Sequence, residues 1–174
     1  HLIIFLNDEV IQILWYSYHF YWFQKEVFLS QLQLSTERNI PISIHCIKAW
    51  DQIYNLLQDN PIPKRGFLLH GFSGPAEMIK PLNDLGAYFS FSGSFTHPKK
   101  ARHRNNFCKI PANRLLIETD APYQSMPDNF TTYHLDGKLN HPANINSLYK
   151  IAADSIGITY EKLTEIAILS AREW

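Results

Sequence analysis

Pro41-Ile-Ser-Ile-His45 and Gly66-Phe-Leu-Leu-His70 are two short apolar runs that each end on a histidine. Both runs have the length and composition of buried strands. The segment between them carries apolar residues at the spacing of one helix face, namely Ala49, Ile53, Leu56 and Leu57. A strand, a helix and a second strand at this spacing are typical of a parallel βαβ unit.

The same alternation extends to both sides of these runs. A helix is predicted ahead of them, with Phe28, Leu32 and Ser35 on one face. The predicted elements are a helix over 24–39, a helix over 75–85 that stops at Gly86, a strand over 87–91, a polar and basic helix or loop through 109, a strand over 114–120, a loop over 121–145, and helices over 147–155 and 160–171. Repeated βα units predict an α/β fold.

His45, His70 and Asp120 each end a predicted strand. In a β/α barrel the carboxyl ends of the strands line the active site, because the βα loops gather there. Two imidazoles and one carboxylate suit a divalent metal ion such as zinc or manganese. Such an ion lowers the pKa of a bound water and stabilises charge on a phosphoryl oxygen. We therefore predict a metal site made by these three side chains.

Each of the three residues also has a plain structural interpretation. His45 or His70 alone could be a hydrogen-bonded histidine at the end of a strand. Asp120 alone could be a helix cap ahead of Pro122. Position alone does not decide between these interpretations and the metal site.

The composition restricts the class of protein. The chain has 174 residues with 16 basic and 16 acidic side chains, which argues against binding nucleic acid mainly by nonspecific charge. Cys46 and Cys108 are too few and too far apart for a disulfide framework or a cysteine zinc site, so we expect a reducing, cytoplasmic setting. The longest apolar stretch, residues 10–23, is shorter than the roughly 20 apolar residues that a membrane-spanning helix needs. We expect no membrane partner.

Four groups of residues resemble consecutive motifs of TatD-type metal-dependent hydrolases in order and spacing. They are Ile44-His45-Cys46 with Ala49, Leu69-His70-Gly71-Phe72-Ser73-Gly74, Tyr88-Phe89-Ser90-Phe91-Ser92-Gly93, and Leu116-Ile117-Glu118-Thr119-Asp120-Ala121-Pro122-Tyr123. Asn140 and Pro142 are similar to the Asn-x-Pro loop of that family. The resemblance covers residues 24–174 and implies a TIM-type β/α barrel of the metal-dependent hydrolase superfamily, forming a single domain over 1–174 in which 1–23 are atypical.

The resemblance also implies roles for individual residues. His45 and His70 match ligands of one metal of a two-metal centre. Asp120 matches a ligand of the other metal that accepts a proton from the attacking water. Glu118 and Tyr123 match positions near the substrate, although a surface carboxylate and a packed aromatic ring are equally good interpretations of them. The implied reaction is hydrolysis of phosphodiester bonds in DNA by metal-activated water.

The sequence departs from the family pattern at its beginning. A complete barrel of this kind has about 250 residues, and the family opens with a His-x-His motif that this sequence lacks. Glu9 lies near the place of the bridging glutamate of the family, but its neighbours do not match. We therefore expect a barrel truncated at its N-terminus, with exposed strand edges that a second copy or a partner protein covers. The aromatic run is then core without its usual cover, or a surface for stacking nucleic-acid bases; its members are Trp15, Tyr16, Tyr18, Phe20, Tyr21, Trp22 and Phe23.

Two hypotheses follow. The first is a metal-dependent deoxyribonuclease. The second is a catalytically impaired remnant that acts as an interaction module, and the missing His-x-His favours it. A further basic segment could contact substrate phosphates or form a solvated face; its residues are Lys99, Lys100, Arg102, His103 and Arg104.

Overall fold

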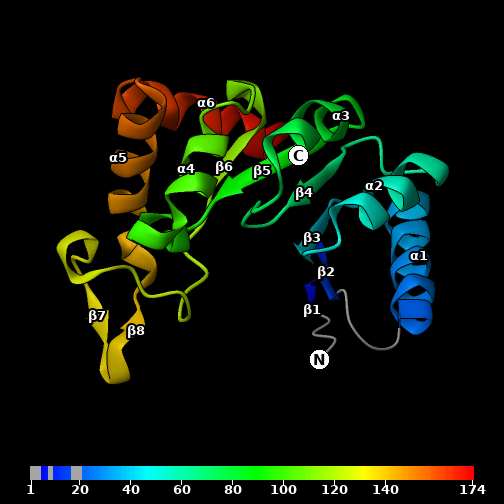
Figure 1. Ribbon diagram of the computed structural model, residues 1–174, viewed down its shortest axis with the longest axis horizontal. Coiled ribbons are helices and arrows are strands. Elements are labelled where there is room, and N and C mark those ends of the chain that lie inside the picture. Colours follow the sequence, from blue (N-terminus) through cyan, green and yellow to red (C-terminus); the bar gives the residue numbers. More distant parts are fainter. Residues whose placement is uncertain (1–4, 8–9, 17–20) are drawn as a thin grey trace. The chain divides into compact units, whose positions relative to one another are not determined.

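The computed structural model describes the backbone of residues 5–7, 10–16 and 21–174. The chain divides into two compact units, and Figure 1 labels the elements of both. Unit 1 consists of residues 1–88 with residues 173–174, and unit 2 consists of residues 89–172. The organisation of residues 1–174 as a single domain stays a prediction.

The strands of unit 1 pair in the order in which they occur along the chain. The second strand pairs with the first in the antiparallel sense, and the second, third and fourth strands pair in the parallel sense. These strands are β1 (Phe5–Asn7), β2 (Val10–Tyr16), β3 (Ile42–Ile47) and β4 (Phe67–Leu69). The βαβ interpretation of residues 41–70 is confirmed by the parallel pairing of β3 with β4 across helix α2 (Trp50–Asp59).

Strand β3 is longer than the sequence predicts. The predicted strand ends at His45, whereas β3 continues to Ile47. Its last two residues pair with β2, because Cys46 lies opposite Trp15 and Ile47 lies opposite Tyr16. The prediction of the strand end is therefore wrong by two residues, and pairing with a neighbouring strand is the reason.

Helix α1 (Tyr21–Arg38) confirms the predicted buried face, since Phe28, Leu32 and Ser35 are at most 1% exposed. The helix ends where Asn39 adopts a φ of 50°, in the left-handed region that asparagine tolerates better than most residues. The Asn39 side-chain oxygen then accepts a hydrogen bond of 3.1 Å from the backbone N–H of Lys64. A short polar residue at this position both stops the helix and ties its end to the segment before β4.

The single helix predicted over residues 75–85 is wrong. The structure has a 3₁₀ turn, η1 (Ala76–Met78), followed by a short helix α3 (Ile79–Asp84). Pro81 is the physical reason, because proline has no N–H and is tolerated only in the first turn of a helix. The spacing of Met78, Ile79, Leu82 and Leu85 predicts that all four are buried. Ile79 and Leu82 are buried, whereas Met78 and Leu85 are only half-buried.

The two faces of strand β3 carry different kinds of side chain. Ile42 and Ile44 of β3 and Phe67 and Leu69 of β4 are fully buried. Complete burial of side chains of this size contributes about 1.5–3 kcal/mol each. Because side chains alternate along a strand, Ser43 and His45 point to the opposite face. Ile42 and Ile44 therefore pack on one face of β3, and His45 lies on the other face.

Strand β5 (Ala87–Phe91), whose predicted bounds are confirmed, contributes its last three residues to unit 2. These residues pair in the parallel sense with strand β6 (Leu115–Ile117). An aromatic cluster fills the core of unit 2. The ring centroid of Phe91 lies 5.3 Å from that of Phe95 and 4.8 Å from that of Phe107, in edge-to-face geometry. This arrangement is favourable for aromatic pairs, and it fixes the segment that follows β5.

The connection between β5 and β6 consists of short helical turns and one helix. They are η2 (Gly93–Thr96), η3 (Pro98–Lys100), α4 (Ala101–Phe107) and η4 (Ala112–Arg114). The sequence predicts either a helix or a loop in this region, and the structure has a helix over residues 101–107. Strand β6 is shorter than the predicted 114–120, so Asp120 lies three residues beyond its end.

The predicted loop over 121–145 contains ordered structure. Strands β7 (His134–Leu135) and β8 (Leu139–Asn140) pair in the antiparallel sense and form a hairpin (Figure 1). The turn between them contains Gly137 at a φ of 71°, a conformation that favours glycine. Three 3₁₀ turns complete the segment: η5 (Asp128–Phe130), η6 (Asp136–Lys138) and η7 (Pro142–Asn144).

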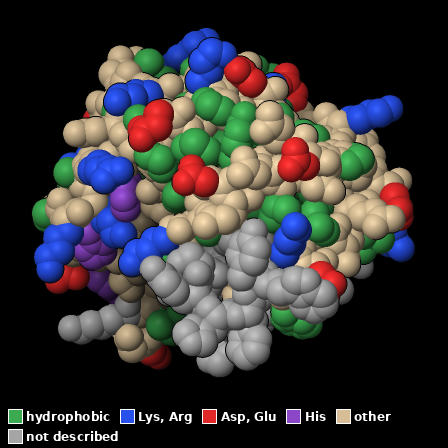
Figure 2. All heavy atoms as spheres, turned by 45° about the vertical axis from the view of Figure 1, so that its right-hand side comes forward, with side chains coloured by type: hydrophobic (Ala, Val, Ile, Leu, Met, Phe, Trp, Pro, Cys, Tyr) green, Lys and Arg blue, Asp and Glu red, His purple; other side chains and the backbone are tan. Residues whose placement is uncertain are grey.

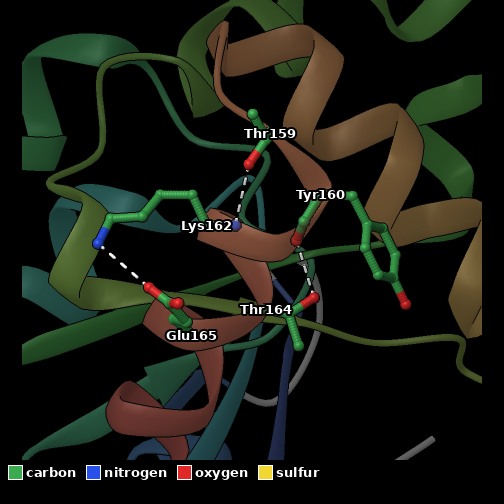
Figure 3. A network of polar contacts seen from close by, with 5 residues as sticks. All are labelled: Thr159, Tyr160, Lys162, Thr164 and Glu165. Carbon is green, nitrogen blue, oxygen red and sulfur yellow. Dashed lines mark hydrogen bonds and ion pairs between the residues drawn. The ribbon is translucent and has the colours of Figure 1, made fainter.

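Two helices close unit 2. Helix α5 (Ile145–Ile156) ends at Gly157, which has a φ of 74°. Helix α6 (Tyr160–Glu173) begins beside Thr159, whose side-chain oxygen accepts a hydrogen bond from the Lys162 N–H (Figure 3). Exposed Lys162 and Glu165 form an ion pair on the first turns of this helix. The sequence predicted both helices, and the structure extends each of them by a few residues.

Some predictions concern the beginning of the chain. Glu9 and residues 17–20 of the aromatic run lie outside the described residues. Trp15 and Tyr16 belong to β2, and Phe23 of α1 is 54% exposed. None of the helices in the described part of the chain is long and apolar enough to cross a bilayer.

Candidate metal centre

His45 lies two residues before the end of β3, and His70 follows the last residue of the neighbouring parallel strand β4. Ile44 of β3 lies opposite Leu69 of β4, so the next residue of each strand is a histidine. The backbone N–H of His70 donates a hydrogen bond of 2.9 Å to the Ile44 carbonyl and extends the ladder past Leu69. The two ring centroids are 5.3 Å apart, with the ring planes inclined by 44°.

This separation fits two imidazoles that bind one metal ion. With metal to nitrogen bonds of about 2.1 Å and tetrahedral geometry, the centroids of two ligating rings would be about 5 Å apart. His70 is only 9% exposed, and His45 is half-buried. The register of β3 and β4 therefore gives the two rings a spacing that would suit a pair of metal ligands.

The loop after β4 packs tightly against the first residue of α2. Trp50 and Phe72 make an edge-to-face contact with ring centroids 4.7 Å apart. A Cβ at Gly74 would lie 2.6 Å from the Phe72 ring and 2.9 Å from Trp50, so only glycine fits there. Burial also raises the pKa of Cys46, the residue after His45, to about 12, which keeps this thiol neutral.

Asp120 is positioned by side-chain hydrogen bonds in the loop after β6. Its φ of 56° lies in the left-handed region, where aspartate is tolerated but not favoured. The Gln124 amide donates a hydrogen bond to Asp120 Oδ2. Ser92, at the end of β5, donates in turn to Gln124 Oε1 over 2.7 Å. The carboxylate is thus connected to β5 through two side chains.

The loop backbone around Asp120 rests on two buried asparagines. Asn140 donates from its amide to the Thr119 carbonyl over 2.8 Å, and its backbone N–H donates to the Pro122 carbonyl over 2.9 Å. Asn144, which is fully buried, donates to Asn140 Oδ1 over 3.0 Å. The Asn144 amide also pairs with the backbone of Tyr133. These bonds connect the Asp120 loop to the β7–β8 hairpin.

Several residues of this network have no role in the sequence-based prediction. Gln124 and Asn144 were missed, while Ser92 and Asn140 were recognised only as members of motifs. Polar residues that recur four positions apart, such as Asn140 and Asn144, are the signal that could have identified part of the network. The left-handed conformation of Gln124, with a φ of 52°, has no such signal.

The structure also decides some of the alternative interpretations. Asp120 is not a helix cap, because turn residues follow it and the next helical segment begins at Asp128. Tyr123 is 71% exposed, so it is not a packed core aromatic. Glu118 follows β6 directly, is half-buried, and donates its backbone N–H to the Phe91 carbonyl over 3.0 Å.

The predicted ligands belong to different units. His45 and His70 lie in unit 1, and Asp120 lies in unit 2. Among the described residues, neither unit by itself gathers three His, Cys, Asp or Glu side chains around one point. The convergence of the three residues on a common metal centre stays a prediction.

A cavity of 520 Å³ in unit 1 is unrelated to these ligands. It is lined by one side of α1 and by the residues after α2, which are Leu29, Leu32, Gln33, Thr36, Glu37, Asn60 and Pro61. Its lining contains one carboxylate and no imidazole, which is too few ligands for a divalent ion. It does not contribute to the candidate centre.

Comparison with known proteins gives a family match over most of the chain. The family model described as "TatD related DNase" matches residues 14–174. The chain is 31% identical over 149 residues to the uncharacterized metal-dependent hydrolase YabD of Bacillus subtilis, covering 86% of this chain and 56% of that protein. It is 32% identical over 123 residues to the 3'-5' ssDNA/RNA exonuclease TatD of Shigella flexneri, covering 70% of this chain and 46% of that protein. The chain thus spans about half the length of the curated relatives that it matches.

Solved structures confirm the predicted fold class. The YJJV TatD homologue of Escherichia coli K12 matches with a TM-score of 0.81 at 20% identity, covering 98% of this chain and 63% of that structure. A TatD-family hydrolase from Entamoeba histolytica matches with a TM-score of 0.71 at 19% identity, covering 97% of this chain and 62% of that structure. The fold is the α/β fold of the TatD homologues, of the TIM-barrel type.

Proposed function

Because the chain belongs to the TatD-related DNase family, a family of metal-dependent hydrolases, we propose that it hydrolyses phosphodiester bonds in DNA with the help of divalent metal ions. The relative named as an exonuclease acting on single-stranded DNA and RNA supports a nucleic-acid substrate. Other relatives bear only the name of metal-dependent hydrolases, which supports the reaction class but not a substrate.

The observation that carries the proposal is the pair of imidazole rings of His45, within β3, and His70, directly after β4. Their centroid separation of 5.3 Å suits two ligands of one ion. A strand ladder fixes the positions of both backbones, so little conformational entropy remains to be lost when the ion binds. His45 and His70 would therefore bind the ion through one nitrogen of each ring.

Asp120 is proposed to bind a second ion and to receive a proton. A divalent ion lowers the pKa of a bound water and stabilises negative charge on a phosphoryl oxygen. In the proposed step the oxygen of a water forms a bond to phosphorus and the Asp120 carboxylate accepts a proton of that water. The bond to the leaving oxygen breaks, and that oxygen takes up a proton from solvent. The hydrogen bond from Gln124 would hold the carboxylate in one orientation during this transfer.

Glu118 and Tyr123 are proposed to contact the substrate. The exposed Tyr123 ring, on the same loop as Asp120, offers an aromatic surface on which a base can stack. Glu118 is nearer the end of β6 and would accept hydrogen bonds from the substrate or from a water. The proposal also includes a cytoplasmic location, which the two free cysteines support, and a second copy or partner that covers an exposed strand edge.

The test is a cleavage assay with purified protein, end-labelled single-stranded DNA, and magnesium or manganese. We expect degradation of the DNA that stops on addition of a chelator. His70→Ala and Asp120→Ala should each abolish it, whereas His134→Ala should not, because His134 is an exposed residue of β7 outside the proposed site. Failure of the unmodified protein to degrade DNA with any of these metals would leave the remnant hypothesis, in which the chain is a non-enzymatic interaction module.

A further inference from the structure

Basic and acidic residues are distributed unevenly along the chain. Residues 85–117 contain no Asp or Glu but six of the 16 Lys and Arg residues, so the rest of the chain has ten basic and 16 acidic residues. A chain with no net charge therefore carries a local positive segment. Figure 2 shows a part of the molecular surface where Lys, Arg and His side chains lie together.

The backbone of this segment is held firmly by its apolar side. Phe95 and Phe107 are 1% exposed and pack against Phe91. The Arg104 guanidinium donates a hydrogen bond of 2.9 Å to the Phe95 carbonyl, which joins α4 to η2. Because these contacts fix one side of η2 and α4, the charged side chains on the other side of this segment are presented from a rigid support.

Lys99, Lys100 and Arg102 lie on that other side, and all three are exposed. Neither of the ion pairs found in the described part of the chain involves them. His103 has a lowered pKa, caused first by its partial burial and then by the positive charges of Lys100 and Arg102. The two charges are thus close enough to act on a common neighbour.

The basic segment is attached to the loop that carries Asp120. His97 Nε2 donates a hydrogen bond of 3.1 Å to the Ser125 carbonyl. A Cβ at Gly93 would lie 3.2 Å from the Gln124 carbonyl oxygen, so the turn after β5 passes close to the same loop. Both contacts lie within unit 2, and together they put the start of the basic segment beside the end of the Asp120 loop.

From this arrangement we propose that Lys99, Lys100 and Arg102 form a binding surface for the phosphate backbone of a nucleic-acid strand whose scissile bond lies at Asp120. This inference rests on the proposed function, since it places the substrate relative to that site. Lysine and arginine side chains that contact phosphates position a strand without reading its sequence. The surface therefore favours a polymer over a small phosphodiester, because only a polymer reaches both the basic residues and the carboxylate.

The experiment measures binding and cleavage separately. Binding of a fluorescent single-stranded oligonucleotide to the whole chain is followed by anisotropy in the presence of a chelator, at several salt concentrations. The test variant carries Lys99→Ser, Lys100→Ser and Arg102→Ser. The matched control carries Lys64→Ser, Arg65→Ser and Lys150→Ser, which removes the same number of exposed Lys and Arg charges from other elements.

The test variant should bind the oligonucleotide at least about tenfold more weakly, and the slope of log affinity against log salt should fall by about 2, as expected for three lost phosphate contacts on a single strand. The control should stay within about twofold of the unmodified protein. Equal weakening in both variants would overturn the inference, because it would show an effect of net charge alone. Absence of binding by the unmodified protein at low salt would overturn it as well.

A second substrate separates this inference from the proposed function. Hydrolysis of bis(4-nitrophenyl) phosphate with manganese requires the metal centre but no polymer contact, so the test variant should retain it while losing DNA cleavage. If the unmodified protein hydrolyses this compound and the test variant binds DNA normally, only the inference fails. If no metal-dependent hydrolysis occurs but oligonucleotide binding depends on the three residues, the proposed reaction fails and the phosphate surface stands.

Discussion

The histidine pair of unit 1 and the aspartate of unit 2 are positioned by different kinds of structure. His45 and His70 inherit their places from a parallel ladder, in which backbone hydrogen bonds fix both strands whatever the neighbouring side chains are. Asp120 lies three residues past its strand and depends on the side chains of Gln124, Asn140 and Asn144. The proposed ligands on the ladder should therefore tolerate changes nearby, whereas the proposed ligand on the loop should be sensitive to changes several residues away.

The largest expected effect comes from removing a ligand from either region. His70→Ala and Asp120→Ala should each reduce metal-dependent hydrolysis by about 10³-fold, because binding of the ions and proton transfer are both lost. Steady-state kinetics with manganese measures the loss, and circular dichroism checks that the fold is retained. If one of the two substitutions has no effect, the two regions do not serve one centre.

Asn144→Ala should have the next largest effect, and on stability. Asn144 Oδ1 accepts hydrogen bonds from the N–H groups of Thr132 and Tyr133, and its amide donates to the Tyr133 carbonyl and to Asn140. Leaving such buried groups without a partner should lower the free energy of unfolding by about 3 kcal/mol. Urea denaturation measures this change.

Two further variants make the Asn144 measurement decisive. Asn113→Ala, at an exposed position of η4, should change the stability by less than about 0.5 kcal/mol. Asn144→Asp retains both accepted bonds, but its second carboxylate oxygen would face the Tyr133 carbonyl and Asn140 Oδ1, so it should be destabilised as well. A stability of Asn144→Ala equal to that of Asn113→Ala would show that the loop does not depend on this side chain.

Gln124→Leu sharpens the comparison more directly, since it removes the donor to Asp120 while keeping the size of the side chain. We expect manganese affinity, measured by calorimetry, and kcat/KM to fall by about tenfold, the usual cost of losing a residue that orients a ligand. The melting temperature should barely change. Gln33→Leu, on the exposed face of α1, is the control and should change neither quantity. Unchanged metal affinity in Gln124→Leu would assign the glutamine a purely structural role.

The smallest expected effect is on the reactivity of Cys46, which reports how rigidly strand β3 is held. Cys46, next to His45, is 3% exposed and burial raises its pKa to about 12, whereas Cys108 is exposed. With a thiol reagent at pH 8, we expect one fast-reacting thiol in the folded protein and two in urea, because only the accessible thiolate reacts. Cys108→Ser should abolish the fast reaction. Rapid labelling of Cys46 in that variant would show that β3 opens readily and would weaken the contrast between the two regions.

The same contrast explains what the sequence could predict. Strand β5 was predicted with correct bounds, because an apolar run between Gly86 and Ser92 has few alternatives. The histidines could be placed because a strand period is a local property. Pro81 is a local signal that the helix predicted over 75–85 is interrupted. Asp136 and Gly137 are a local signal for the hairpin turn. The sequence-based prediction missed both signals.

The hydrogen bonds that position Asp120 could not be predicted from local sequence patterns. Gln124, Asn140 and Asn144 act through hydrogen bonds that exist only after the loop has folded back on β5 and on the hairpin. Their polarity alone is typical of any surface loop. The left-handed conformations of Asp120 and Gln124 likewise depend on the surrounding contacts rather than on the residue type.

The turn of the β7–β8 hairpin offers a practical point of attachment. Gly137 has open space around it, since a Cβ there would meet no atom within 4 Å, and its neighbour Asp136 is exposed. Exposed turns of this kind are where foreign sequence is best tolerated. A fluorophore or an epitope joined there would sit at one end of the hydrogen-bonded chain that passes through Asn144 and Asn140, and could report on changes in the carboxylate loop without occupying it.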